Sequence, residues 1–212
     1  MFNYADYARN LRHELHQIPE IGYDLPKTTA IVKRELDAMG IEYTDKYGKS
    51  SVVGYINPGK SFTIGMRADM DALPIEEKSQ AEYISTHPGN MHACGHDGHM
   101  AILLELARRL NEKDSLPHNV LLIFQPGEET PGGALPICET GVLEKYGVTA
   151  VFGLHLWPGL EKGIVYTREN ELMSRGSELT VDIYGKSTHI GNAAAGIDAT
   201  AAAVEFYRQI RQ

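Results

Sequence analysis

Apolar residues near the N-terminus recur at helical spacing and predict two amphipathic helices. The first set consists of Tyr4, Tyr7, Ala8, Leu11 and Leu15. The second set consists of Ile31, Val32, Leu36 and Met39. Both sets follow the period that places side chains on one face of a helix. Gly40 comes directly after the second set, and we expect it to end that helix as a C-terminal cap.

The next two apolar segments are predicted to be strands. The segments SVVGYI (51–56) and FTIGMRA (62–68) flank NPGK, which is a Pro-Gly turn signal. This pattern predicts a hairpin, or neighbouring strands with a tight connection. A long polar loop is then expected to run to about His96.

Helices and strands are predicted to alternate in the part that follows. A helix is marked by Met100, Leu103, Leu104, Ala107 and Leu110. After it come the apolar strand NVLLIF (119–124), a helix near Leu135 to Tyr146, and the strand AVFGLHL (150–156). Such alternation is typical of an α/β layer structure.

The pattern changes beyond Thr167. The segment ELTVDIYG (178–185) alternates as a half-exposed strand would, and an Ala-rich helix is predicted from Ile197 to the C-terminus. We therefore expect a domain boundary near Arg168 to Arg175, with a first domain over 1–170 and the start of a second over 171–212.

Composition and charge limit the classes to which this protein can belong. A formal net charge of −8 without a basic stripe argues against nucleic acids or anionic membranes as partners. No apolar run approaches the roughly 20 residues of a membrane helix, and the N-terminus lacks a signal-peptide core, so we expect a cytoplasmic protein. Two cysteines cannot form a disulfide framework. Cys138 has apolar neighbours and is expected to be buried.

The segment MHACGHDGH (91–99) concentrates residues that bind metals. In an extended segment Cys94 and His96 would lie on one face and could hold one ion, since thiolate and imidazole are the ligands that zinc-type metals prefer. Asp97 is expected to cap the following helix instead. His92 and His99 could support the ligands or simply be exposed.

Two adjacent carboxylates follow the apolar strand, in QPGEE (125–129). In extended backbone Glu128 and Glu129 would point to opposite sides, so that one could ligate a metal while the other faces a water molecule. The alternative is a solvated acidic loop, which is common. Proximity to the cysteine segment favours the functional interpretation.

Three further residues stand where strands end, which is where open α/β sheets place ligand sites. His155 closes the strand before Trp157, although a histidine on an apolar strand is often a core residue. Asp69 and Asp71 follow an earlier strand, where a carboxylate can hold the second ring nitrogen of a ligand histidine. They could also form an Asx turn or a cap.

These segments together resemble a known family. RADMDALP, MHACGHDGH, QPGEE, PGGAL and GLHLWP occur in the order and spacing of the amidohydrolase branch of peptidase family M20. That branch includes hippurate hydrolases, auxin-conjugate hydrolases and N-acetyldiaminopimelate deacetylases. The resemblance implies a mixed-sheet metallopeptidase-type catalytic domain with helices on both faces, and a smaller inserted α+β lid or dimerisation domain.

The resemblance also implies a site for two divalent metal ions. Cys94 would bridge the ions, His96 and His155 would complete one coordination sphere, and Glu129 would help to hold the other ion. Manganese, zinc, cobalt and nickel all suit this mixture of thiolate, imidazole and carboxylate ligands.

Three residues correspond to other parts of the family's active site. Glu128 corresponds to the general base and Asp69 to the supporting acidic residue. His189, in GKSTHIGNAAAG (185–196), corresponds to a histidine that helps to bind the substrate or the oxyanion. That segment matches the family's glycine-rich substrate loop only loosely.

Members of the family continue beyond the position of Gln212 and contribute one more histidine ligand there. We therefore expect little amidase activity from these 212 residues alone, and a homodimer through the inserted domain in a full-length protein. The expected substrates are small N-acyl amino acids.

The segments PGGALPI and SELTVDIYGK resemble the N-acetyldiaminopimelate deacetylases somewhat more than the hippurate hydrolases, so a deacetylase of that kind is the first subtype expected. Hippurate or indoleacetyl-amino acid hydrolysis is the alternative. A non-catalytic metal-binding or interaction module is the alternative from another class.

Overall fold

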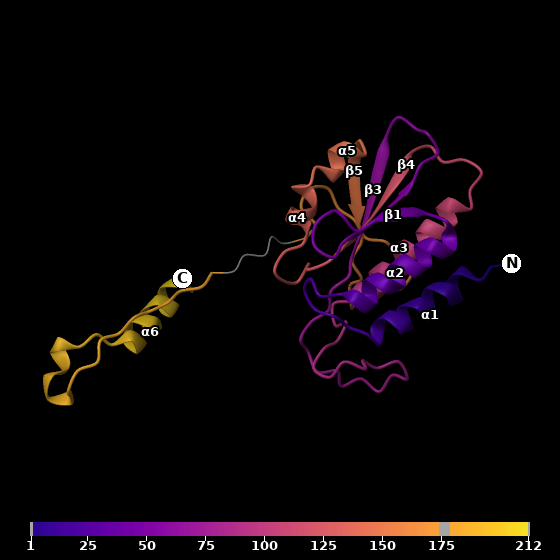
Figure 1. The fold of residues 1–212 in the computed structure, drawn as a ribbon. Helices are drawn as coiled ribbons and strands as arrows, with labels where there is room; N and C mark the ends of the chain where they lie inside the picture. Colours follow the sequence, from indigo (N-terminus) through magenta and orange to yellow (C-terminus); the bar gives the residue numbers. More distant parts are fainter. Residues whose placement is uncertain (1, 174–178, 212) are drawn as a thin grey trace. The chain divides into compact units, whose positions relative to one another are not determined.

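The computed structural model describes residues 2–173 and 179–211, and contacts divide the chain into two compact units, Met1–Leu160 and Glu161–Gln212 (Figure 1). The break lies somewhat before the boundary expected at Arg168 to Arg175. That the second unit is the start of a lid or dimerisation domain stays a prediction.

A five-stranded mixed sheet forms the centre of the first unit. Its strands are β1 (Glu42–Thr44), β2 (Val52–Ile56), β3 (Thr63–Asp69), β4 (Asn119–Gln125) and β5 (Val148–Gly153). They lie in the order β1-β2-β4-β3-β5. β3 runs parallel to β4 and β5, whereas β2 runs antiparallel to β1 and β4. The C-terminal ends of β3, β4 and β5 therefore meet at one edge.

Helices cover both faces of the sheet (Figure 1). One face packs against α1 (Tyr4–His16), α2 (Pro26–Met39) and α3 (His96–Asn111). The other face packs against α4 (Ala134–Cys138) and α5 (Val142–Lys145). The predicted α/β class with helices on both faces is confirmed.

Local sequence explains where these helices start and stop. The Asn3 side chain accepts a hydrogen bond from the Asp6 N–H at 3.2 Å and caps α1. Pro26 opens α2, where its missing N–H costs no hydrogen bond. Gly40 ends α2 in the left-handed conformation with φ +66°, as expected.

The predicted hairpin is wrong, and so is the alternative of two neighbouring strands, because β4 lies between β2 and β3. All seven residues of β4 are buried. A strand that is apolar on both sides needs neighbours on both edges and helices on both faces, so it takes the centre of the sheet. The Pro-Gly turn therefore connects two strands that do not pair with each other.

Three other expectations also differ from the structure. The helix expected over Leu135 to Tyr146 is two short helices, because Gly141 interrupts it with φ +70°. Cys138 is exposed, since it ends α4 and the neighbouring Ile137 is the residue that enters the core. The described part of the expected strand, 179–185, pairs with no other strand.

The second unit contains a short helical segment and one regular helix. The 3-10 segment η1 spans Ile190–Ala195, and α6 spans Ala199–Ile210, close to the Ala-rich helix that was predicted. The Asp198 carboxylate caps α6 by accepting hydrogen bonds from the N–H groups of Thr200 and Ala201. An isolated antiparallel bridge joins Lys186 to Ile197.

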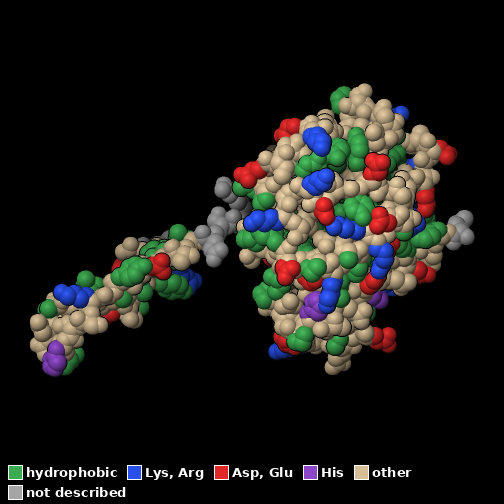
Figure 2. All heavy atoms as spheres, viewed as in Figure 1, with side chains coloured by type: hydrophobic (Ala, Val, Ile, Leu, Met, Phe, Trp, Pro, Cys, Tyr) green, Lys and Arg blue, Asp and Glu red, His purple; other side chains and the backbone are tan. Residues whose placement is uncertain are grey.

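On the face in view, basic and acidic side chains are interspersed over the first unit (Figure 2). This distribution fits the absence of a basic stripe in the sequence. Among the described residues, no helix combines the length and apolarity needed to cross a bilayer.

The central strand generates a stability prediction. Leu122 on β4 is 0% exposed within the larger core, so Leu122→Ala should lower the free energy of unfolding. The expected loss is about 2–5 kcal/mol, because the cavity adds to the lost transfer energy. Leu135→Ala is the matched control: that side chain is 66% exposed, and a change within about 0.5 kcal/mol is expected. Urea unfolding of both variants measures these free energies, and equal losses of stability would contradict the burial of Leu122 in the core.

Candidate metal centre

The candidate site lies at the edge where β3, β4 and β5 end. Asp69 is the last residue of β3, Glu128 and Glu129 follow β4, and His155 follows β5. His96 is the first residue of α3, whose N-terminus meets the same edge. Four separate chain segments thus bring their polar residues to one place, as open α/β sheets commonly do.

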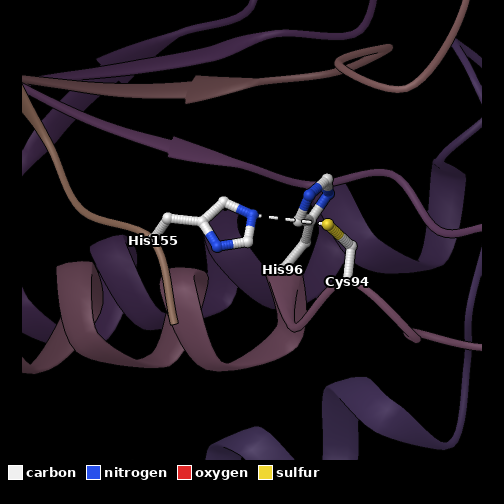
Figure 3. Close-up of side chains that lie close together, drawn as sticks. All are labelled: Cys94, His96 and His155. Atoms are coloured by element: carbon white, nitrogen blue, oxygen red, sulfur yellow. Dashed lines mark hydrogen bonds between the residues drawn. The ribbon is translucent and has the colours of Figure 1, made fainter. Parts of the chain in front are cut away.

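A thiol and two imidazoles face one another in the centre of the site (Figure 3). Cys94 Sγ lies 3.3 Å from His155 Nε2. Cys94, His96 and His155 each offer one ligand atom, and all three atoms lie within 4.8 Å of one another. Cys94 and His96 are brought together by a turn at Gly95, with φ +91°, and not by the extended segment that was expected. Their proximity matches the spacing that a single ion requires.

The hydrogen bonds of the two histidines leave the same ring nitrogen, Nε2, as an acceptor in each; that of His155 faces the Cys94 thiol. Nδ1 of His96 lies 2.7 Å from the carbonyl oxygen of Asp71, and Nδ1 of His155 lies 2.7 Å from the carbonyl oxygen of Leu156. A carbonyl oxygen only accepts, so Nδ1 carries the proton in both rings. In the neutral rings Nε2 therefore presents a lone pair, as a metal ligand must.

Both glutamates of QPGEE face His96. Glu128 Oε2 and Glu129 Oε1 each lie 3.8 Å from His96 Nε2. The expectation that they point to opposite sides is wrong, because they stand in a turn and not in extended backbone. Among the described residues, Glu129 Oε1 and His96 Nε2 are buried without a hydrogen-bond partner. Buried polar atoms are almost always satisfied, so this pair fits a site built to hold a cation.

Asp71 fixes the position of these groups. Its carboxylate oxygens accept the backbone N–H groups of Glu128 and Glu129 at 2.8 and 3.0 Å, while its carbonyl oxygen holds His96. The sequence indicated Asp71 together with Asp69 as a possible partner of a ligand histidine, but it did not predict the contacts of Asp71 with the backbone of Glu128 and Glu129. The position of Asp71 two residues after Asp69 was the available signal, but its contact with Glu128 joins residues 57 positions apart in the sequence.

The electrostatic environment of Cys94 also fits a cation. Burial raises the pKa of the Cys94 thiol, and hydrogen bonding and repulsion by Glu129 raise it further, to about 12. The thiol therefore stays protonated at neutral pH among these carboxylates and the two imidazoles. A divalent ion reverses this balance, because metal coordination deprotonates a thiol.

Asp69 forms a pair with His99. The Leu156 N–H donates to His99 Nε2 at 2.9 Å, so the proton of His99 is on Nδ1, which donates to Asp69 at 2.6 Å. Burial acts to raise the pKa of Asp69, but this bond and the charges of His96 and Arg67 lower it to about 2. Both nitrogens of His99 are occupied, so His99 supports the site and is not exposed.

Two other residues of the cysteine segment point away from solvent. His92 is buried, and burial lowers its pKa to about 4. Asp97 is not the N-cap of α3, which is Gly95. It lies in the first turn, accepts the Gly98 N–H at 2.9 Å, and is fully buried against α1.

His189 lies in the second unit, where its Nδ1 accepts the Gly191 N–H at 3.1 Å and caps η1. Its role with the substrate stays a prediction, as do the individual roles of Glu128, Asp69, Cys94, His96, Glu129 and His155.

Known proteins share this sequence and fold. An IAA-amino acid hydrolase ILR1-like 5 of Arabidopsis thaliana is 41% identical over 202 residues, which are 95% of this chain and 46% of that protein. An uncharacterised hydrolase of Staphylococcus aureus is 37% identical over 99% of this chain and 55% of that protein. The chain thus spans about half the length of these relatives.

A solved structure and a family model agree. A dinuclear metal-binding M20 peptidase of Bacillus subtilis superposes with a TM-score of 0.70 at 39% identity, covering 74% of this chain and 44% of that one. The model of peptidase family M20/M25/M40 matches residues 65–211, which is more than half of the chain. This match confirms the resemblance seen in the motifs, and the chain belongs to peptidase family M20/M25/M40.

Proposed function

We propose that this chain carries the metal-binding part of an amidohydrolase that cleaves N-acyl amino acids. The observation that carries the proposal is that Nε2 of His96 and Nε2 of His155 each present a lone pair beside Cys94. Nε2 of His96 also faces Glu128 and Glu129. The hydrolase and peptidase names of its relatives support the same reaction class.

Cys94, His96, His155 and Glu129 would hold divalent metal ions. Two ions are proposed, since one solved relative is described as a dinuclear metal-binding peptidase. Mixed thiolate, imidazole and carboxylate ligands suit manganese or zinc, and also cobalt or nickel. The ions would act as Lewis acids that polarise the amide carbonyl and lower the pKa of the attacking water.

Glu128 is the proposed general base. Its side chain is 41% exposed, against 23% for Glu129, so it is the carboxylate that can meet water and substrate. It takes a proton from water as the oxygen attacks the carbonyl carbon, and it returns the proton to the nitrogen as the C–N bond breaks. The products are a carboxylic acid and a free amino acid. Asp69 keeps His99 in place and thereby orients the Leu156 N–H beside His155.

Substrates with an aromatic acyl group are proposed ahead of N-acetyl compounds. The Trp157 ring lies 5.8 Å from the His155 ring and is 55% exposed, so it offers an aromatic surface beside the metal ligands. The Arabidopsis relative, whose name refers to IAA-amino acids, supports the same preference. N-acetyldiaminopimelate remains the competing substrate, and the second unit with His189 is proposed to contribute to the lid and to a homodimer.

The first prediction from the proposed function concerns metal content. Cys94→Ala and His155→Ala should each lose bound metal, because each removes one of few ligands. Cys138→Ala is the matched control, since that cysteine is exposed and belongs to none of the candidate ligand groups among the described residues. Elemental analysis of the purified proteins measures the outcome. Unchanged metal in both ligand variants would overturn the site.

The second prediction separates the neighbouring glutamates. In the complete gene product, Glu128→Gln should keep the metals while kcat falls by about 10²–10⁴, the usual effect of losing general acid–base catalysis. Glu129→Gln should release metal, because its buried oxygen faces His96. Metal analysis and steady-state rates on both variants test this. Metal loss confined to Glu128→Gln would exchange the two roles.

The third prediction concerns the reaction. With added Mn²⁺ or Zn²⁺, the complete gene product should release free amino acid from indoleacetyl-alanine and hippurate faster than from N-acetyldiaminopimelate. Metal binding without turnover of any N-acyl amino acid would favour a non-catalytic module. A preference for the N-acetyl compound would reverse the proposed specificity.

A further inference from the structure

A second group of buried charged residues lies beside the first turn of α3 and contains none of the proposed ligands. The His16 ring stands between two carboxylates: Nδ1 lies 2.7 Å from Asp97 Oδ2, and Nε2 lies 3.2 Å from Glu77 Oε1. Arg12 Nε lies 2.8 Å from the same Asp97 oxygen. His16 is only 3% exposed.

The two carboxylate contacts are shorter than the 3.4 Å from Arg12 Nη2 to His16 Nδ1, and they favour His16 as a double donor. Both carboxylates can only accept, so an imidazolium, with a proton on each nitrogen, satisfies both contacts. The hydrogen bond with Asp97 raises the pKa of His16. His16 also occupies the last turn of α1, where the helix dipole favours a cation. Arg12 and His16 then balance the charges of Asp97 and Glu77.

The two carboxylates flank the Cys94–His96 pair in the sequence. Asp97 directly follows His96, and Glu77 lies in the loop that precedes Cys94. The base of this loop is closed by a bridge in which Leu73 and Met91 exchange hydrogen bonds of 3.0 and 3.1 Å. One side chain from α1 therefore holds the chain on both sides of the metal-ligand pair.

The loop itself depends on the same contacts. Glu77 Oε2 accepts the Ser85 N–H at 2.6 Å, and the Thr86 N–H donates to the Gln17 carbonyl at 2.9 Å. Glu77 thus links the loop's own turn to His16, one residue before Gln17. The end of α1 and the middle of the loop form one unit.

Overall stability alone gives little reason for such an arrangement. Replacing a buried ion pair with apolar residues is often neutral or stabilising, because desolvation offsets the Coulomb attraction. What paired buried charges can provide is a single geometry. Here that geometry applies to the residues on either side of Cys94 and His96.

We propose that His16 is a positioning residue of the metal centre, which clamps Glu77 and Asp97 and so fixes the Cys94–His96 turn for metal binding. The proposal rests on the proposed function, since it assumes that Cys94, His96 and His155 bind a divalent ion. His16 does not touch the ion. It acts through the two segments that carry the ligands.

The test is a zinc titration of the 212-residue chain against a chromogenic competing chelator. His16→Gln removes the double donor, and zinc affinity should fall by about 10- to 100-fold, the range known for residues that orient metal ligands. His13→Gln is the matched control: His13 lies on the same helix, stacks on Tyr83 and contacts no carboxylate among the described residues. It should bind zinc as the unsubstituted chain does.

Leu11→Ala tests whether the effect of His16→Gln on zinc affinity is only a result of lower stability. This substitution leaves a cavity in the core beneath α1. This variant should lower the thermal midpoint while zinc affinity stays unchanged. An equal loss of affinity in Leu11→Ala and His16→Gln would overturn the positioning role.

Glu77→Gln keeps the test valid if His16→Gln fails to fold. It removes only the charge on the loop side, and zinc affinity should fall in the same direction. Unchanged affinity in either folded variant would overturn the proposal. If the unsubstituted chain bound no zinc, or if Cys94→Ala bound zinc normally, the proposed metal site and the positioning role of His16 would both be wrong. If Cys94→Ala lost zinc while His16→Gln and Glu77→Gln kept it, only the positioning role would be wrong.

Discussion

Four carboxylates crowd around the ring of one buried histidine. Oxygens of Asp69, Asp71, Glu128 and Glu129 all lie 3.6–3.8 Å from a ring nitrogen of His96. Like charges at such distances repel strongly when water is excluded. Burial acts to lower the pKa of His96, yet this negative environment raises it overall. A site with more negative than positive charge favours cations, and the rest of the first unit holds these groups in place.

The sheet supplies the rigidity that this crowding requires. β4 is buried along its whole length, and its two edges pair with β2 and β3. The turn after β4 carries Glu128 and Glu129, and Asp71 binds both of their N–H groups. The side chain of a metal ligand is most precise when the backbone that carries it cannot shift. The Asp71 carboxylate therefore fixes the backbone of Glu128 and Glu129, whose side chains are themselves negatively charged.

The sequence predicted those features of the structure that depend on residues close together in the chain. Spacing placed Cys94 and His96 in one candidate site, the resemblance to family M20 added His155, and helical periodicity located α1, α2 and α3. It failed where the answer depended on contacts distant in sequence. Whether β2 pairs with β3 or β4 is decided by which strand needs burial on both faces, and the Pro-Gly turn carries no such information. The roles of Asp71 and His16 depend likewise on partners 57 and 81 residues away.

Unsatisfied groups at the site also link metal binding to folding. His96 Nε2 and Glu129 Oε1 are buried without partners among the described residues, which is a cost that the folded chain bears. An ion that binds them adds stability by mass action, about 2.7 kcal/mol at a hundredfold excess over Kd. The unfolded chain lacks the preformed arrangement and gains less. The same residues that weaken the metal-free fold therefore make its stability respond to the metal, and this coupling follows from concentrating charge at one sheet edge.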